Sequence, residues 1–306
     1  MNAGYIDTVR LLLSVTPVVF ASGRFGMKGG TALNLFVQDM PRLSVDIDVV
    51  YLDAAASREV ALQTIAQELG IIKQALERQG LQVRLPANAQ GDEVRLLLTS
   101  DAAQVKVEVN FVFRGTVLPA LLKPLVASAQ DLFTAAVSVP VLAVEELYGS
   151  KLVAAMDRQH PRDIFDAMHM LDQFGWQDLM IDCFVSYLAG HNRPVHEVLF
   201  PPVKSLEPAF SREFLGMTRE PVTLDTLTKT QVRLITELPR QLLPRHRAFL
   251  LSLVQGAPAW QLMPFEHLHA LPAIKWKLMN LEKLRKTHPK RFAAQHDILA
   301  ERLAGV

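Results

Sequence analysis

The sequence lacks the composition that marks several protein classes. Only one of its 306 residues is cysteine, which excludes a disulfide framework and a cysteine-based metal site. No segment of about 18 residues or more is free of polar residues, so no membrane-spanning helix is expected. The formal net charge of +1 argues against a wholly basic nucleic-acid coat, although it allows a local basic face. Half of the residues are hydrophobic, as expected of a globular protein.

The single cysteine and the apolar N-terminal run do not indicate secretion or catalysis. Cys183 lies in the apolar segment MIDCFVSYL, which favours a buried small side chain over a nucleophile. The segment LLLSVTPVVF resembles the core of a signal peptide, but the charges of Asp7 and Arg10 cancel and leave no basic leader. We therefore expect a cytoplasmic protein with no membrane association, and the scarcity of cysteine fits a reducing compartment.

Hydrophobic periodicity divides the chain into two parts. Helical and strand patterns alternate over about the first 135 residues, whereas the later segments are helical and are separated by prolines. The sequence thus predicts an α+β domain with a mixed or antiparallel sheet over residues 1–140 and a helical domain over residues 141–306. The predicted helices cover residues 5–18, 31–38, 59–79, 144–158 and 162–174, the predicted strands cover 18–21, 44–52, 81–85, 94–99 and 104–113, and a turn is expected over 87–93.

Two aspartates lie one residue apart in the otherwise apolar segment SVDIDVVYLD. Alternate side chains of a strand share a face and lie about 7 Å apart, so Ser44, Asp46 and Asp48 point one way. Ile47 and Val49 then point toward the core. Two such carboxylates repel each other unless a cation lies between them or water solvates them. Hard oxygen ligands at this spacing suit Mg²⁺, so one interpretation is a metal site. The alternative interpretation is that both aspartates lie on a strand face that water solvates.

The segment QVKVEVNFVF shows the same alternation and carries another carboxylate. Lys106, Glu108 and Asn110 share one face of this predicted strand, and valines fill the other. If the strand lies beside the aspartate strand, Glu108 joins Asp46 and Asp48 at one site. Two metal ions held by three carboxylates form a known arrangement for in-line phosphoryl or nucleotidyl transfer.

The residues Gly29, Gly30 and Thr31 precede a predicted helix, for which Thr31 is a suitable N-cap. Glycines allow a sharp turn and the close approach of a phosphate, and the start of a helix offers free N–H groups to an anion. The pattern is not a Walker loop, because Lys28 precedes the glycines. A plain turn is the alternative. A phosphate cradle followed by a strand with two aspartates is nevertheless the expected front half of a nucleotidyltransferase site.

The helical half carries a second group of charged residues. Lys151 and Arg158 are seven positions apart on one predicted helix, so they share a face and could hold a triphosphate. A solvated helix face is the alternative. Arg162, Asp163 and Asp166 begin the next helix, where acids interact favourably with the helix dipole. Asp163 is expected to lie nearer the site, and the choice between catalytic and structural roles for Arg162 and Asp166 stays open.

The C-terminal segment is rich in cations and contains Trp276. A basic patch beside an aromatic side chain suits contact with an RNA backbone together with base stacking, and a basic helix surface without a ligand is the alternative. The cations of this segment are Lys275, Lys277, Lys283, Arg285, Lys286, Lys290, Arg291 and Arg302, against Glu282, Asp297 and Glu301.

Three motifs in the expected order resemble the AbiEii/AbiGii toxin family of the DNA-polymerase-β-like nucleotidyltransferase superfamily. They are KGGTALNLF…RLSVDIDVVYLD, VEELYGSKLVAAMDRQHPRDIFDAMHML and LPAIKWKLMNLEKL, and together they span most of the chain. Two positions differ from the common pattern. Glu108 stands where the superfamily often has aspartate, and Thr31 stands where many members have serine, but both replacements keep the chemistry.

This resemblance implies a Mg²⁺-dependent nucleotidyltransferase toxin of a bacterial toxin–antitoxin (abortive infection) system, paired with an antitoxin from a neighbouring gene. It implies transfer of nucleotides from an NTP to RNA, which in characterised relatives is the 3′ end of tRNA. A protein that only binds RNA or a partner, and transfer to a protein or a small-molecule hydroxyl, are the alternatives. The residues implied are Asp46, Asp48 and Glu108 for two metal ions, Lys28, Gly29, Gly30, Thr31, Ser44, Lys151 and Arg158 for the nucleotide, and Asp46, Asp48, Glu108, Lys151 and Asp163 for catalysis.

Overall fold

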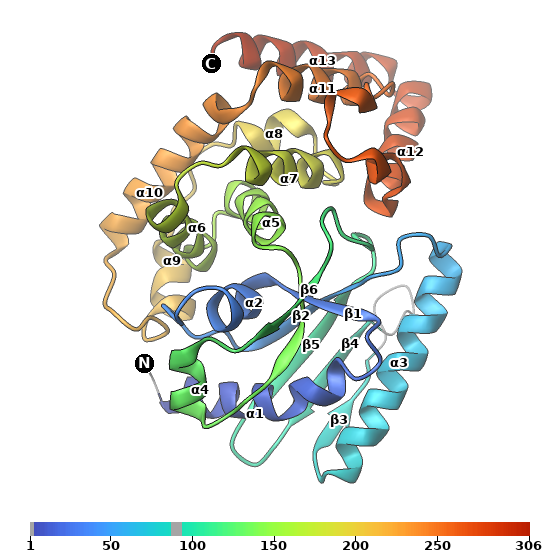
Figure 1. The fold of residues 1–306 in the computed structure, drawn as a ribbon. Coiled ribbons are helices and arrows are strands. Elements are labelled where there is room, and N and C mark those ends of the chain that lie inside the picture. The colour runs from blue at the N-terminus through green and yellow to red at the C-terminus, as the bar shows by residue number, and fades with distance from the viewer. Residues whose placement is uncertain (1–2, 87–93) are drawn as a thin grey trace. The chain divides into compact units, whose positions relative to one another are not determined.

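The computed structural model describes residues 3–86 and 94–306, and Figure 1 shows the fold. The chain divides into two compact units, Met1–Leu147 with Leu215–Pro221 and Tyr148–Phe214 with Val222–Val306. The division falls inside helix α5 (Val144–Asp157). The turn expected over residues 87–93 lies outside the described residues.

A mixed seven-stranded sheet forms the centre of the first unit, as the sequence predicts (Figure 1). The strand order is β3-β4-β5-β2-β1-β7-β6. Strand β2 is parallel to β5 and β1 is parallel to β7, whereas the other neighbouring strands are antiparallel. The strands are β1 (Phe25–Lys28), β2 (Asp46–Tyr51), β3 (Gln82–Arg84), β4 (Arg95–Thr99), β5 (Gln104–Asn110), β6 (Leu121–Pro124) and β7 (Ser138–Val141).

Helices cover this sheet and bury its apolar side chains. α1 contacts β5, β7 and α3, and α3 contacts β3 and β4, while α2 contacts β1 and β2. Ile47 and Val49 of β2 and Val107 of β5 are fully or almost fully buried, as expected for the apolar positions of alternating strands. The helices of this unit are α1 (Ala3–Val19), α2 (Gly29–Phe36), α3 (Arg58–Arg78) and α4 (Ala127–Phe133), together with the start of α5.

The predicted end of the first helix and the predicted first strand are wrong. Helix α1 continues through Pro17 to Val19, and residues 18–21 form its last residues and a turn. A proline inside a helix removes one backbone hydrogen bond, but Val15 and Val19 are buried and this packing outweighs the loss. The first strand is β1, whose four residues carry little strand signal of their own. It forms because β2 and β7 pair with its two edges.

The described residues of the second unit are helical except for turns and loops. Prolines at the first helical position begin α6, α11, α12 and α13, where the missing N–H has no helical partner to lose. Besides the rest of α5, the α-helices are α6 (Pro161–Phe174), α7 (Asp178–Ala189), α8 (Val195–Leu199), α9 (Glu207–Ala209), α10 (Leu224–Glu237), α11 (Pro244–Val254), α12 (Pro272–Thr287) and α13 (Pro289–Ala304). Short π- and 3₁₀-helical turns cover Phe210–Phe214, Leu238–Gln241, Trp260–Leu262 and Glu266–Ala270.

Within residues 3–86 and 94–306, no helix combines the length and the apolar character that crossing a bilayer requires.

Candidate active site

Four charged side chains occupy one face of the two central strands. In the parallel pair of β2 and β5, Asp46 is aligned with Lys106 and Asp48 is aligned with Glu108. Neighbouring strands lie about 5 Å apart, so each aligned pair is close in space. Ile47 lies between the aspartates in sequence and is fully buried on the opposite face. The two strands that carry the carboxylates are therefore neighbours, as a shared site of Asp46, Asp48 and Glu108 requires.

Lys106 is the cation at the centre of this group. Its Nζ lies 2.7 Å from Oε2 of Glu108. Burial lowers the pKa of Lys106, but the hydrogen bond to Glu108 and the charges of Asp46, Glu108 and Asp48 outweigh this effect and raise it above its usual value. Lys106 is therefore protonated at neutral pH and offsets part of the repulsion among the carboxylates.

Two further cations flank the carboxylates on the neighbouring strands β1 and β4. Lys28 of β1 is aligned with Asp48, and Arg95 of β4 is aligned with Glu108. Aligned residues on neighbouring strands point to the same face, so the order across the sheet is cation, carboxylate, carboxylate, cation. This arrangement reduces the repulsion between the adjacent carboxylates.

The glycine turn differs in one detail from its prediction. Helix α2 begins at Gly29 with Lys28 at the N-cap, so Thr31 lies inside the first turn and is not the N-cap. The Thr31 hydroxyl instead donates a hydrogen bond to the backbone carbonyl oxygen of Asp46. Thr31 thus ties the glycine turn to the start of the aspartate strand, which local sequence rules cannot predict because the two residues meet only in the folded sheet.

Both glycines are required by the close packing of the turn. Gly29 has a φ angle of +73°, and a Cβ atom there would collide with the Asp48 carboxylate. A Cβ atom on Gly30 would lie 2.7 Å from the Arg42 guanidinium and 3.0 Å from Oγ of Ser44. The backbone of the turn therefore lies directly against the polar side chains that precede and begin β2.

Sequence reasoning missed Arg42. Its side chain is buried, and its Nη1 donates a 2.9 Å hydrogen bond to the carbonyl oxygen of Leu43. It brings a positive charge next to the proposed phosphate-binding turn. The residue lies in the motif RLSVDIDV, but an arginine before a strand is usually exposed, so no local signal indicated its burial.

Replacing Gly29 by alanine is expected to destabilise the protein by about 1–3 kcal/mol, because alanine is strained at a positive φ angle and its Cβ atom would meet Asp48. Chemical denaturation measures this change in the free energy of unfolding. Gly70→Ala is the matched control, since Gly70 lies within helix α3 and its Cβ would contact nothing. The control should be neutral or more stable by about 0.5–1 kcal/mol. Equal effects of the two substitutions would contradict the packing argument.

The donor chemistry of the strand face fits a divalent cation. Asp46, Asp48 and Glu108 supply the hard oxygen atoms that Mg²⁺ prefers, on two adjacent strands. In the part of the chain that the structure describes, no three His, Cys, Asp or Glu side chains are gathered closely enough to form a metal site as they stand. Glu108 is directed to Lys106 in this arrangement.

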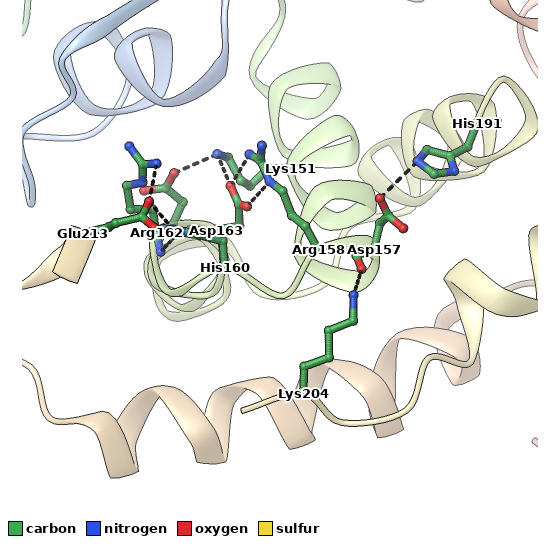
Figure 2. Close-up of polar contacts among 10 residues, drawn as sticks. Lys151, Asp157, Arg158, His160, Arg162, Asp163, His191, Lys204 and Glu213 are labelled. Atoms are coloured by element: carbon green, nitrogen blue, oxygen red, sulfur yellow. Dashed lines mark hydrogen bonds and ion pairs between the residues drawn. The ribbon is translucent and has the colours of Figure 1, made fainter. Parts of the chain in front are cut away.

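The second unit contains a separate, buried cluster of charges around Lys151 (Figure 2). Its Nζ lies 2.9 Å from Oδ1 of Asp163 and 3.0 Å from Oδ2 of Asp166. All three side chains are at most 7% exposed. The solvated helix face considered for Lys151 is therefore wrong, because α5 turns this residue toward the first turn of α6.

Arg158 joins the same cluster from the protein surface (Figure 2). Its Nε and Nη2 donate hydrogen bonds of 2.5 and 2.9 Å to the two carboxylate oxygens of Asp163, while 63% of its side chain stays exposed. Burial alone would raise the pKa of Asp163, but the charges and hydrogen bonds of Lys151 and Arg158 lower it far below its usual value. Asp163 is thus a permanent carboxylate that holds both cations in place.

Arg162 and Asp166 lie four positions apart on α6, but each of them contacts a different residue. Nη2 of Arg162 lies 3.7 Å from Oε2 of Glu213, and Nε2 of His160 lies 3.2 Å from the same oxygen. Asp166 is buried against Lys151 instead. The i,i+4 spacing allowed a pair along the helix, but tertiary contacts supplied nearer partners for both residues.

Contacts at the end of α5 support the position of Arg158. Asp157 accepts a hydrogen bond from Arg193, and its Oδ2 lies 3.5 Å from Nε2 of His191. Nζ of Lys204 donates a 2.7 Å hydrogen bond to the Asp157 carbonyl oxygen (Figure 2). These contacts join three segments at the residue next to Arg158, so they restrict the direction in which Arg158 leaves the helix.

The surface of α12 carries exposed cations beside exposed apolar side chains. Lys275, Trp276, Met279 and Lys283 are all exposed and follow the spacing of one helix face. Neither lysine has an ion-pair partner among the residues that the structure describes. Lys277 does not belong to this surface, because it is 4% exposed and its Nζ donates a 2.6 Å hydrogen bond to the carbonyl oxygen of Arg193. Burial lowers the pKa of Lys277 to about 8.

Comparison with known proteins agrees with this chemistry. The family described as nucleotidyl transferase AbiEii toxin, type IV TA system, matches residues 10–280. Among solved structures, the chain is similar to MenT4, a nucleotidyltransferase toxin from Mycobacterium tuberculosis H37Rv, with a TM-score of 0.61 and 16% sequence identity. The similarity covers 91% of this chain and 94% of that chain, and at this identity it shows the fold. Curated protein sequences include no significant match.

Proposed function

Because the chain belongs to the AbiEii family of nucleotidyl transferase toxins of type IV toxin–antitoxin systems, we propose that it transfers nucleotides from an NTP to RNA with Mg²⁺ as cofactor. The acceptor in this proposal is the 3′ end of tRNA, and the reaction takes place in the cytoplasm. The system supplies an antitoxin as partner, and abortive infection is the physiological setting that the motifs imply.

The observation that carries the proposal is the packing of the glycine turn against the carboxylate strands. The turn at Gly29 and Gly30 lies against Asp48, and Asp48 is aligned with Glu108. A site that binds phosphates beside hard oxygen ligands is what transfer of a nucleotidyl group needs. A protein that only binds RNA has no need of this combination.

Each site residue of the first unit has a role in this proposal. Asp46, Asp48 and Glu108 hold the metal ions, which neutralise the phosphate charge and act as Lewis acids when bound. The N–H groups at the start of α2 and the side chain of Lys28 bind phosphate oxygens, since both present positive charge to an anion. The remaining nucleotide-binding residues are Gly29, Gly30, Thr31 and Ser44.

In the second unit, Arg158 and Lys151 bind the triphosphate and stabilise the leaving pyrophosphate. Arg158 is the exposed member, so it can exchange part of its interaction with Asp163 for a phosphate. Lys151 is held between Asp163 and Asp166, which fixes its position before the substrate binds. Asp163 and Asp166 are therefore positioning residues for these cations.

The exposed face of α12 supports RNA as the acceptor. Lys275 and Lys283 can bind the phosphate backbone, and Trp276 offers a ring on which a base can stack. Trp276 and Met279 expose apolar surface to water, which is unfavourable. Binding of a ligand that covers these side chains would remove this unfavourable exposure.

The test of the function uses the wild-type protein, Mg²⁺ and each α-labelled NTP in turn, with total bacterial tRNA as the acceptor. We expect label to enter RNA from one preferred NTP, RNase to degrade the labelled product, and EDTA in the reaction to prevent its formation. Label that resists RNase and moves with protein or a small molecule would redirect the proposal to another acceptor. Absence of label with every NTP, together with retained RNA binding, would favour the non-catalytic alternative.

Trp276→Ala is expected to weaken binding of tRNA by about tenfold, because stacking of one base contributes roughly 1–3 kcal/mol. Filter binding at a fixed salt concentration measures the dissociation constant. Lys229→Ala is the matched control, since Lys229 is an exposed helical cation in the same unit that pairs with Asp225. An unchanged dissociation constant for Trp276→Ala would remove α12 from the RNA-binding surface.

A further inference from the structure

The cation Lys106 lies where the proposed function requires metal ions. It is aligned with Asp46 and makes a 2.7 Å ion pair with Glu108. Three carboxylates and one ammonium thus share the face of β2 and β5. The roles assigned above to the carboxylates leave Lys106 unexplained.

We propose that Lys106 is an internal competitor of the divalent metal ion, which neutralises the carboxylates in the metal-free protein and releases Glu108 when the ion binds. This inference rests on the proposed function, because it assumes that Asp46, Asp48 and Glu108 bind the metal.

The electrostatic reason is that the two cations need the same oxygen atoms. An ammonium in contact with Glu108 repels a divalent ion held by the same group, and both interact with the neighbouring aspartates. Without any cation, the three carboxylates would repel one another. Lys106 therefore stabilises the metal-free sheet and weakens the binding of metal, so that occupation of the site requires a higher concentration of the ion.

The opposite role makes the opposite prediction. If Lys106 only orients Glu108 toward the metal ion, its removal would weaken metal binding, as the loss of an orienting contact does at other metal sites. The sign of the change in affinity therefore decides between competition and orientation.

The experiment measures Mn²⁺ binding by isothermal titration calorimetry and melting temperature with and without Mn²⁺, so that neither readout depends on activity. Lys106→Met and Lys106→Gln remove the charge, and Lys106→Arg keeps it. Lys73→Met is the matched control, because Lys73 forms an exposed ion pair with Glu77 on α3 of the same unit. We expect both neutral variants to bind Mn²⁺ roughly tenfold more tightly than the wild type, since one like charge beside the ion is removed.

The same neutral variants are expected to melt at a lower temperature without Mn²⁺ and to gain more from its addition than the wild type. Lys106→Arg and Lys73→Met should bind Mn²⁺ as the wild type does. Equal or weaker binding by both neutral variants would overturn the inference while leaving the proposed function intact. If the wild type and all variants fail to bind Mn²⁺, the metal site of the proposed function is wrong and the inference is wrong with it.

Discussion

Asp48→Asn is expected to reduce the rate of nucleotide incorporation into RNA by about a thousandfold or more. Asp48 lies against the glycine turn and is aligned with Glu108, so it is the carboxylate that joins the two halves of the proposed site. An amide in its place keeps the shape but loses the negative charge that holds a divalent ion. Metal ions stabilise the transition state of such reactions by several kcal/mol, and about 4 kcal/mol corresponds to a thousandfold change in rate.

The stability of Asp48→Asn should remain within about 1 kcal/mol of the wild type, because the substitution also removes repulsion between carboxylates on one strand face. Rates come from single-turnover incorporation of the preferred labelled NTP, and stability comes from denaturant unfolding. Asp101→Asn is the control, since Asp101 is exposed in a bend between β4 and β5. A variant at Asp48 that keeps more than a tenth of the wild-type rate would exclude this residue as a metal ligand.

Lys151→Met is expected to lower the free energy of unfolding by about 3–5 kcal/mol, the typical cost of removing one partner from a buried ion pair. The substitution removes the ammonium that lies within 3.0 Å of both buried carboxylates, Asp163 and Asp166, while the exposed Arg158 still pairs with Asp163. A methionine fills a similar volume, so the loss arises from charge and not from a cavity. Denaturant unfolding of the purified protein measures the change.

A second substitution separates the electrostatic cost from a simple packing defect. Lys151→Met combined with Asp166→Asn removes one cation and one anion together, and the double variant should be more stable than Lys151→Met alone. Lys229→Met, at a side chain that is 76% exposed, is the control and should cost less than about 1 kcal/mol. A loss below about 1 kcal/mol for Lys151→Met would show that the cluster is solvated in solution.

Features that depend on short stretches of chain could be predicted from the sequence. The period of two in the segment from Ser44 to Val49 placed the aspartates on one face and the valine and isoleucine on the other, because a strand allows only that alternation. The mixed fold and the toxin family were also predicted correctly, since the family motifs are local and are separated by recognisable spacings. Gly29 indicated the turn because glycine readily adopts the positive φ angles that other residues avoid.

Features that depend on contacts between distant segments were decided only by the tertiary structure. Strand β1 forms because two other strands pair with it. Thr31 lies inside the first turn of α2, where its hydroxyl donates a hydrogen bond to the backbone carbonyl oxygen of Asp46. Lys106 and Glu108 lie near the two aspartates because β2 and β5 are parallel in one particular register. A shift of that register by one residue would turn one strand's charges to the opposite face, and no local pattern specifies the partner strand.

Burial of charge was the other property that sequence alone could not supply. Arginine and lysine are usually exposed at the protein surface, yet Arg42 and Lys151 are both buried in the folded chain. A buried cation is tolerated only where carboxylates or carbonyl oxygens surround it, as Asp163 and Asp166 surround Lys151. The sequence by itself determined which chemical groups this protein carries. The tertiary structure decided which of them are paired, because ion pairing and burial are set by neighbours that the chain brings together only on folding.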